Sequence, residues 1–170
     1  LGLIDKPTSG KIFFTGKDAS ELWSDELADI RRREIGFVFQ DFYLLNSLSV
    51  KENIMLPMVL DKAPVDKCYK NVEAYAENFG LSHLLEKQPY EVSGGEKQRV
   101  AICRALINNP DLILADEPTG NLDTKASNEI MHLLKTSNRE LNQTIIMITH
   151  NMELAKAADR TIMIEDGKIR

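Results

Sequence analysis

Two acidic residues and one histidine stand at the ends of strand-like runs in this sequence. Asp116 and Glu117 end a buried-strand pattern that starts at Asp111, and His150 follows the strand-like run from Thr144 to Thr149. At the carboxyl end of a parallel strand, an Asp can hold Mg²⁺ while an adjacent Glu orients or deprotonates an attacking water. Two surface acids at a strand end would give the same pattern. The pair alone therefore fits a catalytic site and a plain acidic surface equally well.

A serine and two glycines precede a helical pattern. Ser93, Gly94 and Gly95 come directly before the helical stretch from Glu96 to Asn108. A helix start presents unpaired backbone N–H groups, and glycines let a phosphate approach the backbone closely. A simple serine-capped helix would have the same residues. Only the other motifs in the sequence can therefore favour a phosphate contact.

The sequence contains no Gly-x-x-x-x-Gly-Lys-Ser/Thr loop, which would hold the phosphates of a nucleotide. Gly10 and Lys11 resemble its end, but Asp5 stands where the first glycine would be and Ile12 where the hydroxyl residue would be. These residues predict a turn into a strand. Because the chain begins at Leu1 and not at a methionine, we expect the phosphate loop to lie upstream in the intact protein.

Composition narrows the classes of function. The length of 170 residues is typical of a single domain, and 43% of the residues are hydrophobic and 28% charged. The net charge is −5, which disfavours nucleic acid as a partner. The basic run Arg31–Arg33 ends a predicted helix capped by Ser24, where it complements the helix dipole. Cys68 and Cys103 lie in helical patterns and fit reduced, buried thiols.

Short apolar runs alternate with helical patterns, which predicts an α/β fold with a mostly parallel sheet. One helical stripe joins Val65, Tyr69, Val72, Ala76 and Phe79 and is predicted to face the core. The predicted strands are 11–15, 35–39, 112–116, 144–149 and 161–165. We expect one domain over 1–170, with core parts at 1–41 and 109–170 around a helical subdomain at 42–108.

The motifs together resemble those of the ATP-binding cassette (ABC) ATPases. Val92–Arg99 resembles the family's signature motif, and Leu112–Glu117 resembles its Walker B strand with the catalytic glutamate. Further matches, in the family's order, are Gln40 to the Q-loop glutamine, Pro89 to the proline before the signature, Gly120–Asp123 to the D-loop and His150 to the switch histidine. The resemblance covers essentially the whole chain. It implies a P-loop NTPase core whose N-terminal strand and phosphate loop are missing from this chain.

The resemblance also implies a mechanism with ATP and Mg²⁺ as cofactors. Mg²⁺ would be held near Asp116 and Gln40, Glu117 would act on the hydrolytic water, and His150 would contact the γ-phosphate. In this family two ATPase domains pair head to tail, here most simply as a homodimer. ATP binding closes the dimer and hydrolysis releases it.

The family's dimer assigns further residues to nucleotide contact across the interface. Ser93, Gly94, Gly95 and Glu96 would close over nucleotide bound by the partner domain, and Asp123 would help to link the two sites. Glu96 stands where many members have Gln, and the neighbouring Val92 where many have Leu.

The stretch Asp116–Asp123 resembles the branch of lipoprotein-releasing, macrolide-exporting and bacitracin-type antimicrobial-peptide transporters, and Phe37–Gln40 supports the same branch. We therefore expect the ATP-binding subunit of a transporter, held at the cytoplasmic face of the membrane by a permease that the residues after Gln40 contact. Residues 44–60 look most like the peptide-resistance group.

Three alternatives stay open from the sequence. A translation-factor ABC protein would need a second cassette in the same chain, and the Gly120-Asn121 pattern disfavours it. A non-transport ABC ATPase of DNA repair would carry a long coiled coil between Gln40 and Ser93, whereas only positions 41–92 lie there, without heptads. A degenerate, non-catalytic module would have no chemical need for Glu117, His150 and Gln40. For the 170-residue chain on its own, we expect poor folding and no useful ATP binding.

Overall fold

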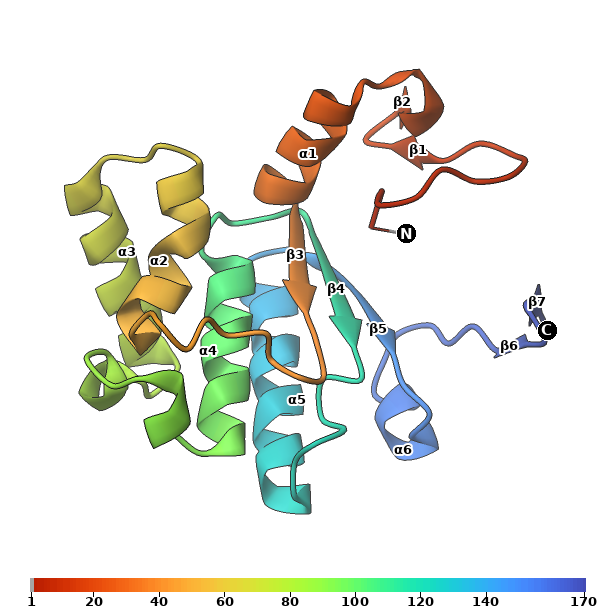
Figure 1. The fold of residues 1–170 in the computed structure, drawn as a ribbon. Coiled ribbons are helices and arrows are strands. Elements are labelled where there is room, and N and C mark those ends of the chain that lie inside the picture. The colour runs from red at the N-terminus through yellow and green to blue at the C-terminus, as the bar shows by residue number, and fades with distance from the viewer. Residues whose placement is uncertain (1) are drawn as a thin grey trace.

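The computed structural model describes residues 2–170 and has a three-stranded parallel sheet at its centre (Figure 1). The strands are β3 (Ile35–Val38), β4 (Leu112–Asp116) and β5 (Thr144–Ile148), in the order β3-β4-β5. In the register, Ile35 lies opposite Leu112, which lies opposite Thr144. The predicted parallel sheet and α/β class are therefore confirmed.

Side chains of the sheet alternate between two apolar clusters, as strand geometry requires. Val38, Ile113 and Ala115 belong to the larger cluster, which we call the main core. Ile35 belongs to a smaller cluster, with Phe37 and Leu114 packed against it. Both faces of the sheet are thus apolar, which explains why β3 and β4 read as continuous hydrophobic runs.

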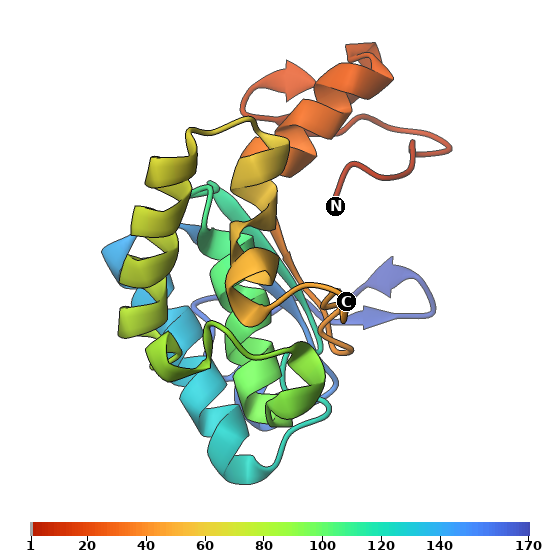
Figure 2. The same cartoon turned by 60° about the vertical axis from the view of Figure 1, so that its left-hand side comes forward.

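Helices cover the face of the sheet that borders the main core (Figures 1 and 2). They are α2 (Val50–Leu60), α3 (Val65–Asn78), α4 (Gly94–Leu106) and α5 (Thr124–Glu140). Helix α4 packs on both β3 and α2, and α5 packs on α4 and β5. Short 3₁₀ turns at Ser82–Leu84 and Pro89–Glu91 lead from α3 into α4.

The predicted core stripe of α3 is only partly correct. Val72, Ala76 and Phe79 are buried in the main core, as expected. Val65 and Tyr69 are instead 64% and 42% exposed, although Cys68 between them is buried. Two apolar side chains of this helix therefore remain on the surface.

The predicted strand over 11–15 is wrong in extent. It shortens to β1 (Phe13–Phe14), which pairs antiparallel with β2 (Lys17–Asp18) and lies outside the central sheet. Thr15 and Gly16 have φ values of 46° and 82°, the left-handed conformations of a tight hairpin turn. The chain reverses after two residues, so a longer strand cannot form.

The predicted strand over 161–165 is wrong for the same reason. Only β6 (Ile164–Glu165) forms, and it pairs antiparallel with β7 (Lys168–Ile169). The turn between them is Asp166-Gly167, with φ values of 49° and 73°. A short helix, α6 (Met152–Ala155), precedes this hairpin, which stands to the side of the central sheet in Figure 1.

Helix α1 (Ser24–Arg33) begins one residue earlier than predicted, because Trp23 and not Ser24 occupies the cap position. The Glu26 carboxylate accepts a hydrogen bond from the Trp23 N–H at 2.9 Å and so satisfies the helix start. At the other end, Arg33 pairs with Asp61 at 2.7 Å. The pair joins the end of α1 to the residue after α2, and the predicted effect of the arginines on the helix dipole stays a prediction.

Cys68 and Cys103 are both buried free thiols, as predicted, and burial raises the pKa of Cys103 well above its ordinary range. Within residues 2–170, no helix has the length and apolar content needed to cross a bilayer.

Candidate active site

Glu117 and His150 meet at the carboxyl ends of β4 and β5. The Glu117 Oε1 atom accepts a hydrogen bond from the His150 backbone N–H at 2.8 Å and lies 2.7 Å from His150 Nδ1. The Thr149 hydroxyl donates to the other carboxylate oxygen of Glu117 at 3.3 Å. Both ends of the carboxylate are therefore oriented by the residues that follow β5. The sequence predicted Glu117 and His150 but not this contact.

A left-handed backbone turn brings Glu117 to this position. Its φ is 43°, which costs a non-glycine residue about 1–2 kcal/mol. The Glu117 N–H donates to the Ile148 carbonyl at 2.9 Å, which ties the turn to the end of β5. Strained backbone that persists under such restraint is found preferentially at functional sites, and this turn aims the side chain across the edge of the sheet.

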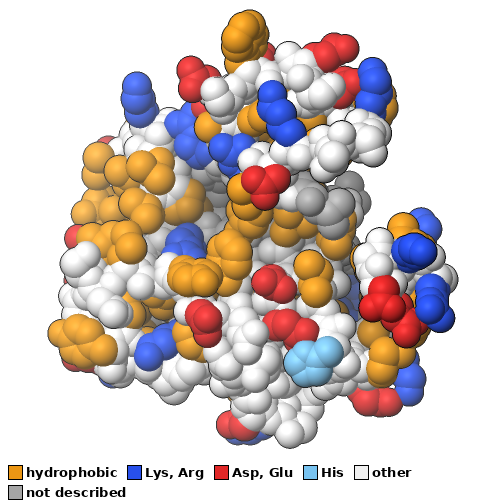
Figure 3. Space-filling view, turned by 45° about the vertical axis from the view of Figure 1, so that its right-hand side comes forward, with side chains coloured by type: hydrophobic (Ala, Val, Ile, Leu, Met, Phe, Trp, Pro, Cys, Tyr) orange, Lys and Arg blue, Asp and Glu red, His pale blue; other side chains and the backbone are white. Residues whose placement is uncertain are grey.

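Asp116 ends β4, and its carboxylate is exposed to solvent. Within residues 2–170, no three His, Cys, Asp or Glu side chains gather closely enough to hold a metal ion by themselves. Mg²⁺ is usually bound through one or two protein oxygens together with phosphates and water. A single exposed carboxylate beside the end of the sheet fits that mode of binding. Figure 3 shows acidic side chains and a histidine together on one face of the molecule.

Gln40 lies in the loop of residues 39–49 between β3 and α2, which we call the Gln40 loop. The Gln40 side-chain amide donates to Asn121 Oδ1 at 3.1 Å. The Asn121 amide donates in return to the Gln40 carbonyl at 3.2 Å and to Asp41 at 3.0 Å. Asn121 thus binds the backbone and the side chain of the Gln40 loop. Sequence reasoning missed this role, although an Asn can donate and accept at once.

Gly120 leaves the space that Gln40 occupies. A Cβ atom at this position would lie 2.9 Å from the side-chain Cδ and Nε2 atoms of Gln40. The segment after Glu117 is therefore shaped around the predicted metal-contacting glutamine. It links the ends of β3 and β4 at one edge of the sheet.

Ser93 caps helix α4 through a reciprocal pair with Glu96. The Glu96 carboxylate accepts from both the N–H and the hydroxyl of Ser93 at 2.7 Å, and the Glu96 N–H donates to the Ser93 hydroxyl at 3.4 Å. These bonds from Ser93 lower the pKa of Glu96. The helix start is thus rigid, and Gly94 and Gly95 form its first turn.

The first glycine of α4 faces the segment that also holds Gln40. A Cβ on Gly94 would lie 3.6 Å from Leu122 and 4.0 Å from the Asn121 carbonyl. Asp123 caps the next helix, because its carboxylate accepts from the Ala126 N–H at 2.8 Å. The structure gives Asp123 this local role, and its predicted part in linking two sites stays a prediction.

Gln98 is a buried polar residue that the sequence analysis did not single out. Its side chain is fully buried, and its amide donates to the Pro118 carbonyl at 2.7 Å. The bond fastens helix α4 to the turn directly after Glu117. Helix α4 therefore contacts the site at its start and again one turn later.

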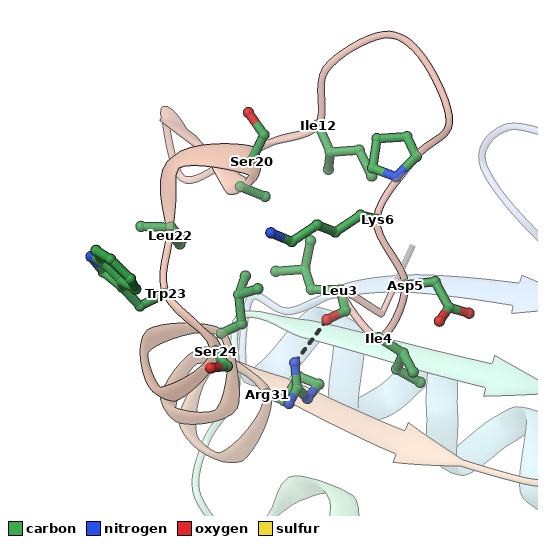
Figure 4. Close-up of a pocket in the computed structure, with 13 residues that line it drawn as sticks. Leu3, Ile4, Asp5, Lys6, Ile12, Ser20, Leu22, Trp23, Ser24 and Arg31 are labelled. Carbon is green, nitrogen blue, oxygen red and sulfur yellow. Dashed lines mark hydrogen bonds between the residues drawn. The ribbon is translucent and has the colours of Figure 1, made fainter.

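A cavity of about 340 Å³ lies apart from these residues, between the N-terminal segment and α1 (Figure 4). Leu3, Ile4, Trp23 and Leu27 supply apolar parts of its wall. Arg31 also lines it and donates to the Leu3 carbonyl at 2.7 Å. None of its lining residues belongs to the predicted site.

Comparison with known proteins gives consistent matches. A family model described as ABC transporter matches residues 2–120. YvcR of Bacillus subtilis, named an uncharacterized ABC transporter ATP-binding protein, is 46% identical over 168 residues that cover 99% of this chain and 65% of that protein. The macrolide export ATP-binding/permease protein MacB of Haemophilus ducreyi is 45% identical over 99% of this chain and 24% of that protein.

A solved structure agrees with these matches. It is a dimeric post-hydrolysis state of the ATP-binding cassette MJ0796 bound to ADP and Pi, with a TM-score of 0.88 and 39% identity. The alignment covers 99% of this chain and 74% of that one. This chain spans about two thirds of the length of YvcR. The family match, the fold and the motifs at the ends of β3, β4 and β5 show that the chain belongs to the ABC transporter family.

Proposed function

We propose that the protein hydrolyses ATP as the nucleotide-binding subunit of an ABC transporter. The observation that carries the proposal is the Glu117 carboxylate, held between Thr149 and His150 at the end of the central sheet. A carboxylate in this position acts on a water molecule beside a phosphate, and the neighbouring imidazole supplies a donor to that phosphate. These roles follow the family resemblance, and the geometry favours them.

Four of the chain's residues then divide the work at the bound nucleotide. Glu117 orients and deprotonates the water, and His150 donates to the γ-phosphate as its charge develops. Asp116 and Gln40 are the residues that would hold Mg²⁺, which neutralises phosphate charge when it is bound. In the present conformation the Gln40 side-chain nitrogen donates to Asn121, whereas a metal ion would be bound by the side-chain oxygen.

The proposed active unit is a head-to-tail pair of two copies. Ser93, Gly94, Gly95 and Glu96 would close over nucleotide bound by the partner copy, with residues 42–108 as the helical subdomain that carries them. The capped start of α4 presents backbone N–H groups of the kind that bind phosphate. The dimeric relative bound to ADP and Pi supports this arrangement.

A permease is the proposed membrane partner, and it would hold the subunit at the cytoplasmic face. MacB, whose name includes a permease, supports a partner of this kind. Several exposed apolar side chains lie on the Gln40 loop, α2 and α3, where the sequence places the permease contact. They are Tyr43, Leu45, Val59, Leu60, Val65 and Tyr69. Burial of such side chains favours association with another protein.

The proposal is tested by Mg²⁺-dependent ATP hydrolysis in the full-length protein. Substitution Glu117→Gln keeps the shape of the side chain but removes the base, so kcat is expected to fall by about 100-fold or more. Size-exclusion chromatography should show that the Glu117→Gln protein still dimerises when ATP is added. The test requires both the fall in kcat and the retained dimerisation, because loss of dimerisation would indicate a folding or binding defect.

Glu86→Gln is the matched control. Glu86 pairs with Lys51 on the surface, and its side chain is 79% exposed, so hydrolysis should stay close to that of the wild type. A wild-type protein without ATP turnover would contradict the proposal and favour a non-catalytic module. Wild-type turnover in Glu117→Gln would show that another group is the base.

A further inference from the structure

The Gln40 loop has no regular secondary structure, yet side chains from three other elements hold it. Asn53 of α2 is fully buried, accepts from the Leu45 N–H at 2.8 Å and donates to the Leu45 carbonyl at 3.0 Å. Asn121 holds Gln40 from the segment after β4. The third side chain comes from α4 and binds the middle of the loop. A loop held at three points is expected to move as a unit or not at all.

Arg104 of α4 is this third contact. Its guanidinium donates to the Tyr43 carbonyl at 2.6 Å and to the Phe42 carbonyl at 2.7 Å. Two donors in a fixed planar fork match two successive carbonyl oxygens, and the positive charge strengthens both bonds. The guanidinium is partly shielded from water by the loop, and burial lowers the pKa of Arg104, although an arginine stays charged.

The two carbonyls belong to an uncommon stretch of backbone. Phe42 and Tyr43 have φ values of 62° and 44°, so two consecutive non-glycine residues are left-handed. Such a pair persists only when surrounding contacts determine it. Arg104 supplies a contact to each of the two peptide groups. The left-handed pair begins two residues after Gln40, so it constrains the path of the backbone on the side of Gln40 that points away from β3.

Helix α4 meets the Gln40 loop at both of its ends. Arg104 binds the loop from the last turn of the helix, whereas Gly94 lies in the first turn. A Cβ on Gly94 would be 4.0 Å from the ring of Phe42. The loop thus lies close to both ends of the helix, including the capped start where nucleotide contact is proposed.

We propose that Arg104 is a positioning residue, which clamps the Gln40 loop in its left-handed turn and makes loop and helix α4 move together. It does not touch nucleotide and acts through Gln40. The inference rests on the proposed function only for the role of Gln40 at the metal. The clamp itself is a property of the folded chain and can be measured without ATP.

The clamp is tested first by hydrogen–deuterium exchange of the nucleotide-free, full-length protein. In Arg104→Gln, amides of residues 40–45 should exchange about tenfold faster, because two charge-assisted bonds are lost. Amides of β4 should exchange as in the wild type. Arg104→Lys keeps the charge but carries its donors on a single nitrogen and loses the planar fork, so it should give an intermediate rate. It serves in place of Arg104→Gln if that variant does not fold.

Arg31→Gln is the matched control for exchange. Its guanidinium also donates to a main-chain carbonyl, that of Leu3 at 2.7 Å, but far from the Gln40 loop. Exchange of residues 40–45 should not change in this variant. If amides 40–45 exchanged as much faster in Arg31→Gln as in Arg104→Gln, the cause would be a general loss of stability. That result would overturn the clamp.

A double-mutant cycle then shows whether Arg104 acts through Gln40. In the wild-type background, Arg104→Gln should lower kcat about tenfold, whereas in the Gln40→Ala background the same change should alter kcat by less than about twofold. Equal factors in both backgrounds would overturn the proposed route. Wild-type exchange over 40–45 in Arg104→Gln would overturn the clamp itself. A wild-type protein without ATPase activity would instead refute the proposed function, and the exchange result would still stand.

Discussion

The start of α4 and the Glu117–His150 pair are held by contacts of different range. Ser93 and Glu96, which stabilise the helix start, are three residues apart. Glu117 and His150 are 33 residues apart and meet only because β4 and β5 are neighbours in the sheet. A local cap contributes to stability wherever its helix forms. A contact between strand ends exists only when the sheet is assembled.

This difference predicts that substitutions in the two regions will separate stability from activity. Changes at the Glu117–His150 pair should act mainly on turnover, because the His150 side chain is 85% exposed and neither residue belongs to an apolar cluster. Changes at the cap of α4 should act on folding as well. Four substitutions or titrations, from the largest expected effect to the smallest, test that separation.

His150→Ala should give the largest effect. The His150 side chain is 85% exposed, so the free energy of unfolding should change by less than about 0.5 kcal/mol. Loss of the donor to the phosphate should lower kcat about 100-fold. Urea unfolding and ATPase assays measure the two quantities. His83→Ala removes another exposed histidine and should alter neither. A large loss of stability in His150→Ala would mean that the pair is structural.

Gly120→Ala should give a smaller effect on activity. The new Cβ would lie 2.9 Å from Gln40 and would displace its side chain, so we expect kcat to fall about tenfold. Thermal unfolding should change little, because Gln40 is exposed and can turn away. The same substitution in the Gln40→Ala protein should have no further effect. A persistent tenfold loss there would show that Gly120 acts by another route.

Ser93→Ala should lower the free energy of unfolding by about 1 kcal/mol, through loss of the cap of α4. Ser49→Ala is the matched comparison, because Ser49 caps α2 with Glu52 by the same set of bonds. Both variants should lose a similar amount of stability in urea titrations. Only Ser93→Ala should weaken ATP-dependent dimerisation. Equal dimerisation in the two variants would contradict a nucleotide contact at Ser93.

The smallest effect should be a pH dependence of stability from Glu96. The bonds from Ser93 hold the pKa of Glu96 below its ordinary value of 4.5, so the unfolded chain binds a proton more readily than the folded chain. The contribution is complete above that value and is lost as pH falls through the folded pKa. Urea titrations between neutral and acid pH should show a shallower acid loss in Ser93→Ala. An identical pH profile would contradict the bond as its source.

Much of the fold could be predicted from local pattern. The strands β3, β4 and β5 and helix α4 appear within a residue or two of their predicted bounds, because apolar periodicity reports which face is buried. The hairpins at 13–18 and 164–169 were predicted as single strands. Their turn residues, Thr15-Gly16 and Asp166-Gly167, carry a hairpin signal that an apolar run alone does not show.

The candidate site was predicted as residue types, but its contacts were not. Glu117 reaches His150 through a left-handed turn that no periodicity indicates. Asn121 binds Gln40 across a separation of 81 residues. Gln98 is a polar residue with a fully buried side chain, which composition would place on the surface. Each contact depends on a partner distant in the chain.

By itself, the sequence determined the α/β alternation, the start of helix α4 at Ser93 and the set of groups that can do chemistry on a phosphate. These features depend on interactions between residues a few positions apart, and such local interactions can form in almost any fold. Only the tertiary structure decided that Arg104 donates to the carbonyls of Phe42 and Tyr43, and that the ends of β4 and β5 bring Glu117 to His150. The reason is physical: such bonds form only after the parallel sheet has brought distant segments together.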